Sequence, residues 1–282
     1  MAQDSPHAGL TEVLVTQVGA GERTERSDWL SVEQPLAIQI EGELLATTMR
    51  TPGHDFELCL GLLFAEGIVR YRADVGTIAH CGHLGDEGYG NLVDVRSGPG
   101  VRLEVADGSP AKRGTLSTSA CGVCGRRSID DLLARCSPVE PFVTSVSAVA
   151  RAVSSISAQQ HMHKLSGGLH AAGIADLAGA VHLVREDVGR HNAVDKLIGR
   201  LLLDAKTDTE TAPARGRILA VSGRTSFEIV QKAVMAGAAV VAGVSAPSTL
   251  AVETAERAGL ILCGFVRDGR LNAYTHAERL TS

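Results

Sequence analysis

The segment STSACGVCGRR contains the two residues of this chain best suited to chemistry. Cys121 and Cys124 are separated by two residues, and a glycine follows each. A thiolate attacks sulfur readily, and its pKa falls beside cationic side chains and near the amino terminus of a helix. Arg126 and Arg127 follow at once, and the sequence predicts a helix just downstream. The pattern favours a thiol that collects sulfur at one surface and delivers it at another.

The residues around the two thiols support this hypothesis. Gly122 and Gly125 predict an open tether with no side chain crowding either sulfur atom. Cys124 then has two possible roles: it stabilises a persulfide on Cys121, or it displaces the persulfide and closes a transient disulfide. The sequence does not choose between them. The other cysteines lie in or beside apolar runs and are interpreted as small buried side chains: Cys59, Cys81, Cys136 and Cys263.

Other uses of a CxxC pair stay open. One pair supplies two of the four ligands of a structural zinc ion, and the segment HCGH offers His80, Cys81 and His83 for the rest. A redox pair of the thioredoxin type would follow a buried strand, whereas the preceding RGTLSTSA is small and polar. An inert pair is disfavoured because exposed thiols are a liability.

Composition limits the class of protein. The 282 residues are 44% hydrophobic but only 3% aromatic, which predicts an aliphatic core in one large or two modest domains. With 27 basic and 32 acidic residues the net charge is -5, so no basic face for nucleic acid is expected. No signal peptide and no apolar run of membrane-spanning length is visible. Six cysteines are too few for a secreted disulfide scaffold, and we expect a cytoplasmic protein.

The chain divides into three parts by pattern. Residues 1–115 contain short alternating strands and one helix at about 56–69, which predicts a smaller strand-rich α+β domain. Residues 116–144 hold the cysteine loop and a connecting helix. Residues 145–282 begin with a helix over 145–163 and then alternate strands with helices, which predicts an α/β domain with a mostly parallel sheet covered on both faces. The order of elements is similar to the three-layer cytidine-deaminase-like architecture.

Deaminase activity does not follow from that order. A zinc deaminase needs H-x-E at the start of one core helix and P-C-x-x-C at the start of the next. The corresponding segments here are EDVGRHNAVDK and SGRTSFEIVQK, and His191 is followed by Asn192 and Ala193. The order of elements therefore predicts a scaffold and leaves the function open.

Two loops of this scaffold are candidates for binding an anion. SGRTS follows an apolar strand and opens a helix, so free backbone N–H groups and Arg224 favour phosphate. In FVRDGR two arginines flank an Asp-Gly pair just past a buried strand, where ligands of α/β sheets gather. Spacing alone favours a hairpin turn with solvated charges there. The HMH run at 161–163 is interpreted as the end of a helix.

Several motifs in order give the chain a family resemblance. SACGVCG, REDVGRHNAVDK, SGRTSFEIVQKA, VSAPSTLAVE and a terminal GFVRDGR with LNAYTH resemble the formate dehydrogenase accessory sulfurtransferases, the FdhD family, over nearly the whole chain. The resemblance implies that Cys121 is the persulfide-carrying cysteine and Cys124 its partner. It also implies that one stretch binds a guanine dinucleotide cofactor: Phe265, Val266, Arg267, Asp268, Gly269 and Arg270.

The resemblance further implies a function. A sulfurtransferase of this family accepts sulfur from a cysteine desulfurase and passes it to the molybdenum of a bis-molybdopterin guanine dinucleotide cofactor. The cofactor is bound as a substrate before insertion into formate dehydrogenase, and the protein is expected to be a homodimer. The alternative is a guanine-nucleotide-binding regulator with a structural zinc site at the CxxC pair and no sulfur chemistry.

Overall fold

The computed structural model describes most of the chain. The described residues are 9–19, 21–83, 85–86, 88–103, 129–130, 132–136 and 138–282. Cys121, Cys124 and the two arginines after them lie outside these residues. The tether expected around the two thiols therefore stays a prediction.

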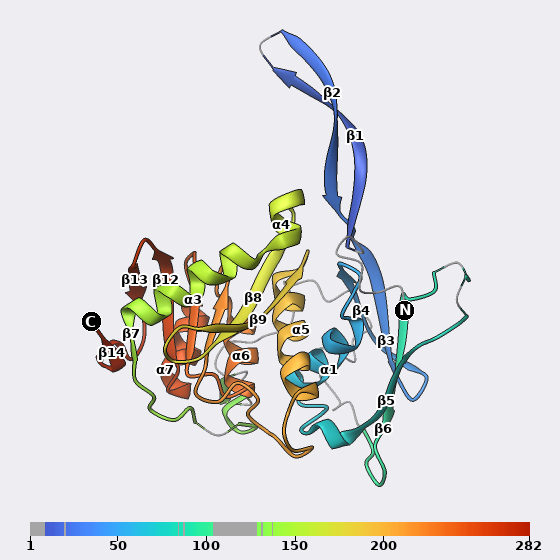
Figure 1. Ribbon diagram of the computed structural model, residues 1–282. Coiled ribbons are helices and arrows are strands. Elements are labelled where there is room, and N and C mark those ends of the chain that lie inside the picture. The colour runs from blue at the N-terminus through green and yellow to red at the C-terminus, as the bar shows by residue number, and fades with distance from the viewer. Residues whose placement is uncertain are drawn as a thin grey trace.

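A six-stranded sheet forms the centre of the larger half of the protein (Figure 1). Its strand order is β13-β12-β11-β10-β8-β9. The strands are β8 (His170–Ala175), β9 (Val181–Asp187), β10 (Ile218–Val221), β11 (Val240–Gly243), β12 (Ile261–Arg267) and β13 (Arg270–Ala273).

The sheet is mixed, so the prediction of a mostly parallel sheet is wrong. Strand β11 is parallel to both β10 and β12, whereas the other three pairings are antiparallel. The reason is the length of the connections. A turn at residues 176–180 joins β8 to β9, and the pair Asp268-Gly269 joins β12 to β13. Strands joined by so short a turn must pair antiparallel. The longer connections through helices α6 and α7 allow the two parallel pairings, and β8 lies between β9 and β10, antiparallel to both.

Helices cover both faces of this sheet, which gives three layers. Helix α3 (Val146–Gln159) packs on one face, against alternate strand residues such as Ile218 and Ala220. The intervening residues, such as Leu219, join the core on the opposite face. That face carries α5 (Arg190–Leu203), α6 (Phe227–Met235) and α7 (Thr249–Ala258). The predicted α/β class is confirmed for the described residues.

The helix expected over residues 145–163 is two helices. Helix α3 ends at Gln159, and α4 (His161–Ser166) begins after Gln160. The carboxylate of Glu186, at the end of β9, accepts hydrogen bonds from the backbone N–H groups of Met162 (3.0 Å) and His163 (2.8 Å). A distant carboxylate thus satisfies the first turn of α4 and lets the chain change direction at Gln160.

The smaller half contains a four-stranded sheet in the order β4-β3-β6-β5. Its strands are β3 (Gln34–Ile40), β4 (Glu43–Arg50), β5 (Val75–His80) and β6 (Leu92–Ser97). Helix α1 (Asp55–Ala65) lies between this sheet and α5 (Figure 1). The remaining short elements are η1 (Arg72–Asp74), β7 (Thr144–Ser145), η3 (Ala277–Arg279) and β14 (Leu280–Thr281).

Two glycines allow α1 and α5 to touch backbone to backbone. A β-carbon on Gly61 of α1 would lie 1.9 Å from the carbonyl oxygen of Asp195. A β-carbon on Gly199 of α5 would lie 1.9 Å from the carbonyl oxygen of Glu57. Any larger residue at either position would force the helices apart, because real Cβ contacts do not come within 3.0 Å.

The buried core runs through this helix pair without a break. Leu36 and Ile38 of the four-stranded sheet belong to the same apolar cluster as Leu197 of α5 and Leu219 of the six-stranded sheet. The three-part division of the chain stays a prediction. Its first boundary falls outside the described residues, and its second falls within β7, which pairs with β14 at the other end of the chain.

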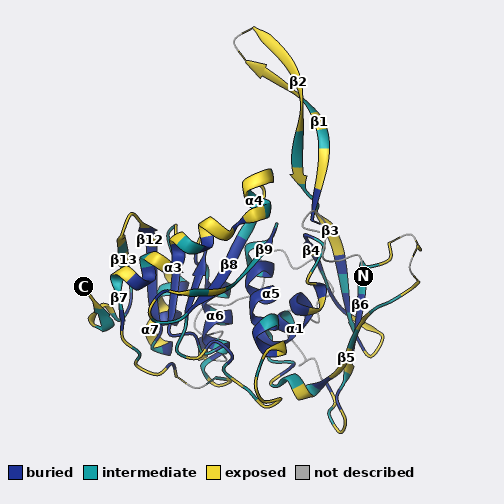
Figure 2. Ribbon diagram, viewed as in Figure 1, coloured by how far each residue is buried: buried dark blue, intermediate teal, exposed yellow. Residues whose placement is uncertain are grey.

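A long hairpin stands out from this body (Figure 1). Strands β1 (Leu10–Gly19) and β2 (Glu22–Ser31) pair only with each other among the described strands, and most of their residues are exposed (Figure 2). The polar sequence of β2 does not predict a strand, because it lacks alternating apolar residues. No described helix has the length and apolar character needed to cross a membrane.

A buried ion pair fastens α1 to β9 and leads to a prediction. Arg185 donates to Glu57 through Nε (2.5 Å) and Nη2 (2.9 Å). Burial works to raise the pKa of Glu57, but the hydrogen bonds and charges of Arg185 and His54 lower it to about 2. The pair therefore stabilises the fold fully above pH 4.5, the ordinary pKa, and loses that contribution as the pH falls toward 2.

We expect Arg185→Gln to lower the free energy of unfolding by about 3 kcal/mol at pH 7, because a pKa shift of this size corresponds to that energy. In urea titrations the difference from the unsubstituted protein should shrink as the pH falls below 4.5. Arg200→Gln is the matched control, since Arg200 lies 3.9 Å from Glu57 but is 41% exposed, and it should cost less than about 1 kcal/mol. A difference that is equal at pH 7 and pH 3 would contradict the assignment.

Candidate functional site

The loops that follow four strands of the large sheet meet at one edge. The chain leaves β9, β10, β11 and β12 at this edge, and β8 begins there with His170 opposite Asp187. Hydrogen bonds tie neighbouring loops together, from Ser248 N to Thr225 O (3.1 Å) and from Phe265 N to Ser245 O (3.3 Å). Ligands of open α/β sheets bind at the carboxyl ends of strands, so this edge is the candidate site.

A cavity of about 340 Å³ opens at this edge. Two imidazoles, His163 and His170, line it together with Gln160 and Ser222. Its remaining walls are Ser157, Gly167, Gly168, Leu169 and Val244. Helices α3 and α4, the start of β8 and the ends of β10 and β11 all contribute, so the cavity exists only in the folded sheet. Its size is at the lower end of the range for small-molecule sites.

The ring of His163 is held in one orientation. Its Nδ1 lies 2.7 Å from the carbonyl oxygen of Leu169, which accepts a hydrogen bond and therefore fixes the proton on Nδ1. Glu186 holds the backbone N–H of the same residue. In the neutral imidazole, Nε2 of His163 can then accept a hydrogen bond from a ligand in the cavity.

His170 is kept neutral near pH 7. Burial lowers the pKa of His170 below its usual 6.5, and the positive charge of Arg190 lowers it further. Gly223 leaves room for this ring, because a β-carbon at that position would make a tight contact of 3.3 Å with Nδ1 of His170. An anion in the cavity would reverse the shift, since negative charge favours the protonated imidazole.

Two buried polar groups at the edge lack a partner among the described residues. Gln160, one of the residues that line the cavity, is only 5% exposed, and its buried Nε2 has no hydrogen-bond partner there. Nε of Arg190 is also buried without an acceptor. An unsatisfied buried donor costs about 1 to 3 kcal/mol, and a bound acceptor would remove that cost. Both groups are donors, which favours a ligand rich in oxygen acceptors.

A second polar cluster lies at the starts of α5 and α6, at the same edge of the sheet. Nε2 of His191 lies 2.8 Å from the carboxylate of Glu228 and 3.1 Å from Oγ of Ser226. Burial acts to raise the pKa of Glu228, but His191 and the nearby cations lower it overall, so Glu228 is ionised at neutral pH. Arg224, from the predicted anion-binding loop, points to solvent as an exposed residue beside this cluster.

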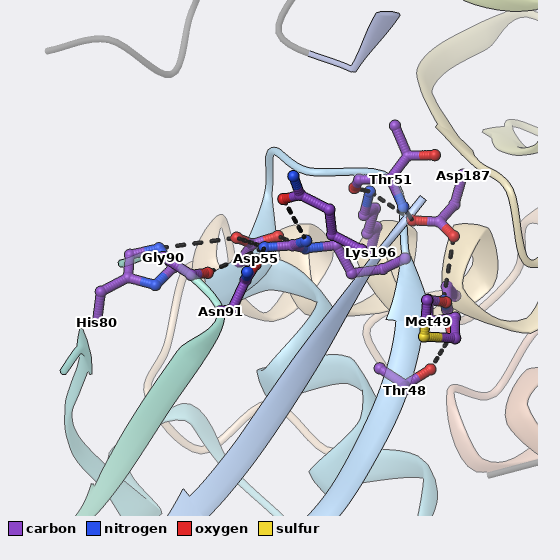
Figure 3. Close-up of polar contacts among 12 residues, drawn as sticks. Thr48, Met49, Thr51, Asp55, His80, Gly90, Asn91, Asp187 and Lys196 are labelled. Atoms are coloured by element: carbon purple, nitrogen blue, oxygen red, sulfur yellow. Dashed lines mark hydrogen bonds and ion pairs between the residues drawn. The ribbon is translucent and has the colours of Figure 1, made fainter. Parts of the chain in front are cut away.

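A buried ion pair beneath the edge positions these residues (Figure 3). Lys196 of α5 lies 2.7 Å from Oδ2 of Asp187, and the two side chains are 1% and 0% exposed. Lys196 also donates to the carbonyl oxygen of Thr51 (2.8 Å), and Asp187 accepts from the backbone N–H of Thr51 (3.1 Å) and Gly189 (2.8 Å). The charge of Asp187 thus fixes the turn that carries Arg190 and ties it to the smaller half of the protein.

The segment from Phe265 to Arg270 lies at the same edge, next to the cavity wall. Val244 lines the cavity, and the following Ser245 accepts the hydrogen bond from Phe265 N. Phe265 has φ of 52° and is 49% exposed, a conformation that is costly for an aromatic residue. Asp268 and Gly269 have φ of 50° and 73°, as in the turn of a two-residue hairpin.

The exposed side chains of this segment surround one buried anchor. Val266 is 3% exposed and packs into the core, whereas Arg267, Asp268, Gly269 and Arg270 are exposed at the hairpin tip. The geometry is the hairpin turn that spacing alone favoured. Its place beside the cavity is compatible with a binding role, which stays a prediction.

Most of the described cysteines are unsuited to sulfur chemistry. Burial raises the pKa of the Cys59 and Cys136 thiols, and it raises the pKa of Cys263 to about 12. Cys59 and Cys263 are fully buried, as predicted, while Cys81 and Cys136 are partly exposed. A thiol with a raised pKa stays protonated at neutral pH and is a poor nucleophile, so Cys59, Cys136 and Cys263 do not compete with the CxxC pair.

The proposed zinc ligands near residue 80 are not gathered in the described residues. His80 Nε2 instead lies 3.7 Å from Asp55, whose carboxylate pairs with the buried guanidinium of Arg50 (Figure 3). Within the described residues no three His, Cys, Asp or Glu side chains form a metal-binding group. The CxxC pair itself lies outside those residues.

Sequence reasoning missed the cavity and two of its main residues. It assigned no role to His170, and it interpreted the HMH run containing His163 as a helix end. For His163 the local signal was Gly167, which ends a helix just after the HMH run. For His170 there was none, since one histidine at the start of an apolar strand is unremarkable in a sequence.

Known proteins similar to this chain were found by three comparisons. Residues 31–281 match the model of the FdhD/NarQ family. The chain is 49% identical over 280 residues to the sulfur carrier protein FdhD of Anaeromyxobacter dehalogenans (strain 2CP-C), covering 98% of this chain and 95% of that protein. It is 42% identical over 271 residues to the protein of the same name from Mycolicibacterium paratuberculosis, with coverages of 94% and 97%.

A solved structure is similar in fold. The crystal structure of a protein assigned as a formate dehydrogenase accessory protein, from Desulfotalea psychrophila, superposes with a TM-score of 0.73. The match covers 96% of this chain and 99% of that chain at 19% sequence identity. The arrangement of sheets and helices described above is therefore shared with an experimentally determined protein.

The Asp187–Lys196 pair gives a prediction for the edge. We expect Asp187→Asn to lower the free energy of unfolding by about 3 kcal/mol or more, because it leaves the buried ammonium of Lys196 without a counter-ion. Lys196→Met should cost a similar amount by leaving the carboxylate unpaired. The double variant should cost less than the sum of the two, as measured by urea denaturation at pH 7. Additive losses would show that the two side chains do not act as a pair.

Proposed function

Because the chain belongs to the FdhD/NarQ family, we propose that it is a sulfurtransferase that carries sulfur as a persulfide on Cys121. A cysteine desulfurase is the donor in this proposal. The acceptor is the molybdenum of bis-molybdopterin guanine dinucleotide, bound as a substrate before its insertion into formate dehydrogenase. We place this reaction in the cytoplasm and assign it to a homodimer on a cytidine-deaminase-like scaffold.

The observation that carries the proposal is the contrast among the cysteines. Burial raises the pKa of three of the four described thiols, Cys59, Cys136 and Cys263. Cys121 and Cys124 instead precede two arginines in a glycine-rich segment. Neighbouring cations stabilise a thiolate, and glycine leaves it accessible to another protein. Relatives named sulfur carrier protein support the same role.

The loading step is a thiol–persulfide exchange. The Cys121 thiolate attacks the terminal sulfur of the donor persulfide, the S–S bond of the donor breaks, and the donor cysteine leaves as a thiolate. The proton on the terminal sulfur moves with it, so the carrier gains one sulfur atom and no net electrons. Arg126 and Arg127 favour the anionic forms on both sides of this exchange.

The delivery step needs an electron pair if sulfur is to leave as sulfide. Cys124 supplies it by attacking the inner sulfur of the Cys121 persulfide. A disulfide between Cys121 and Cys124 forms, the terminal sulfur departs as hydrosulfide toward the metal of the substrate, and the proton of Cys124 is released. External thiols then reduce the disulfide and restore the carrier. In the other role left open by the sequence, Cys124 only stabilises the persulfide.

The edge of the large sheet fits the anionic substrate. Its two partnerless donors, Gln160 and Arg190, and the imidazoles of His163 and His170 suit phosphate oxygens. A cavity of about 340 Å³ is too small for a whole bis-dinucleotide and receives one end of it. The exposed ring of Phe265 and the arginines of the adjoining hairpin then contact the rest.

The persulfide is the first test. After incubation with a cysteine desulfurase and cysteine, we expect the intact mass of the protein to rise by one sulfur atom. The adduct should disappear on reduction and should be absent in Cys121→Ala, because the proposal places the transferred sulfur on that thiol. Cys263→Ala is the matched control and should load normally.

The regulator hypothesis makes the opposite prediction. It requires about one zinc ion per chain that is lost with Cys121 or Cys124, and no sulfur adduct. Formate dehydrogenase activity in cells would then be insensitive to Cys121→Ala. That combination would overturn the sulfur-carrier proposal.

The anion site is tested separately with guanosine diphosphate as the probe. We expect His170→Gln and Arg190→Gln each to weaken binding about tenfold, because each removes a charge-assisted or polar contact to phosphate. Binding should also tighten below pH 6.5 more steeply in the unsubstituted protein than in His170→Gln, since the proton taken up by the lowered-pKa imidazole adds a positive charge.

The control for that experiment is Arg151→Gln. Arg151 donates to the carbonyl oxygen of Ala178, in the turn at the opposite end of β8, so its loss should leave the affinity unchanged. Isothermal titration calorimetry measures all three variants. If the three variants lose equal affinity for guanosine diphosphate, or if none of them loses affinity, the anion site does not lie at this edge.

A further inference from the structure

The hairpin of β1 and β2, here called the arm, has no core of its own. Leu14 and Val18 are 69% and 66% exposed, and the arm stands clear of the body (Figures 1 and 2). Only its base is held, by a hydrogen bond between the hydroxyls of Ser31 and Ser166 (2.8 Å). An isolated two-stranded hairpin is marginally stable in water, so an arm of this length requires a partner.

The outer edge of β2 is free to form a ladder. Val32 N donates to Gly9 O (2.9 Å), so residues 9 and 32 form a hydrogen-bonded pair. In an antiparallel ladder, hydrogen-bonded pairs alternate with non-hydrogen-bonded pairs, so this one contact fixes the type of every other pair in the arm. Even-numbered residues of β2, such as Thr24, therefore direct their backbone groups to β1. Arg23 and Glu25 direct theirs outward, where no strand of the described residues pairs with them.

The exposed sequence of this edge is complementary to itself in charge. Residues 22–26 read ERTER, and a twofold axis at Thr24 maps each charge onto its opposite. Glu22 would face Arg26 of the partner subunit. Arg23 would face Glu25 of the partner subunit. The outward-facing backbone groups of these two residues would then form the hydrogen bonds between the two β2 strands. Opposite charges directly across a ladder are stabilising.

We propose that the arm is a homotypic docking surface: β2 pairs antiparallel with β2 of a second copy of this chain, with Thr24 facing Thr24 of the partner subunit. Two arms then form one four-stranded sheet, β1-β2-β2-β1, and both free β2 edges are removed. The inference does not depend on sulfur transfer, and it assigns the surface through which the expected homodimer forms.

The charge order selects this register over its neighbours. A shift of the axis to residue 23 places two arginines opposite each other, and a shift to residue 25 places two glutamates opposite each other. Like charges directly opposite are destabilising. Charged residues on an edge strand can also serve to prevent any pairing with another sheet. For that purpose a run of charges of one sign would be enough, because it repels in every register. The alternating order repels in the shifted registers and attracts in one.

Disulfide trapping tests the register. At a non-hydrogen-bonded pair the Cα atoms lie about 4.5 Å apart, within the range that a disulfide spans. We expect Thr24→Cys to form a covalent dimer under copper-phenanthroline oxidation, with two residue-24 peptides joined in the mass spectrum. Gln17→Cys is the matched control. Residue 17 pairs with residue 24 inside the arm, so across the dimer its two copies lie three strands apart, roughly 14 Å, and cannot be joined.

Charge exchange tests the pairing without new cysteines. Arg23→Glu and Glu25→Arg each create two like-charge pairs per dimer, and we expect each to raise the dissociation constant of the dimer about tenfold. The double variant restores opposite charges and should restore the dimer. Neither residue has an ion pair within the described chain, so folding is unaffected, and thermal melting of the monomer verifies this. Sedimentation velocity over a concentration series gives the constants.

Three results would overturn the proposal. The first is that Thr24→Cys cross-links no more than Gln17→Cys. The second is that the single charge variants dimerise as the unsubstituted chain does, and the third is that the double variant does not recover the dimer. A dimer that persists in all variants would form through another surface of the protein. A protein that is monomeric at every concentration would show that the charges of ERTER only prevent the pairing of β2 with another strand.

Discussion

The structure depends on a buried charge pair at the junction of its two halves. Asp187 and Lys196 are almost wholly inaccessible, so neither charge is solvated by water and each needs the other. Among their other hydrogen bonds are those to Thr51, just after a strand of the smaller sheet, and to Gly189, at the turn before α5. The same contacts that satisfy the charges therefore lock the two halves together, which explains why one apolar core continues across them.

This junction also prepares the candidate site. The turn held by Asp187 leads into Arg190, and the preceding Glu186 holds the first turn of α4, which presents His163 to the cavity. The neighbouring residues Glu186 and Asp187 thus hold two different parts of the candidate site, the start of α4 and the turn before α5. The cost is a set of buried donors that the described protein does not satisfy, on Gln160 and Arg190. An anionic substrate would satisfy them, and the low pKa of His170 allows that ring to gain a proton when negative charge arrives.

Much of the architecture could be predicted from local pattern. The turn between β8 and β9, the ends of α7 and β10, and the loop SGRTS between strand and helix lie where glycine, serine and alternating apolar residues place them. The direction of strand pairing and the break at Gln160 could not. Pairing depends on which strands become neighbours, and the break depends on a carboxylate 26 residues away along the chain, so neither leaves a local signature.

The sequence by itself determined the chemistry that this protein offers: a close pair of thiols beside arginines, a set of motifs shared with one family, and a charge order in ERTER that is complementary to itself. Those properties reside in residue types and short spacings, which exist before folding. The tertiary structure alone decided which residues form the candidate anion site, because His163, His170 and Gln160 come together only when strands and helices distant in the chain are packed. Burial also decided which thiols are inert, since desolvation, rather than residue type, raises the pKa of Cys59 and Cys263.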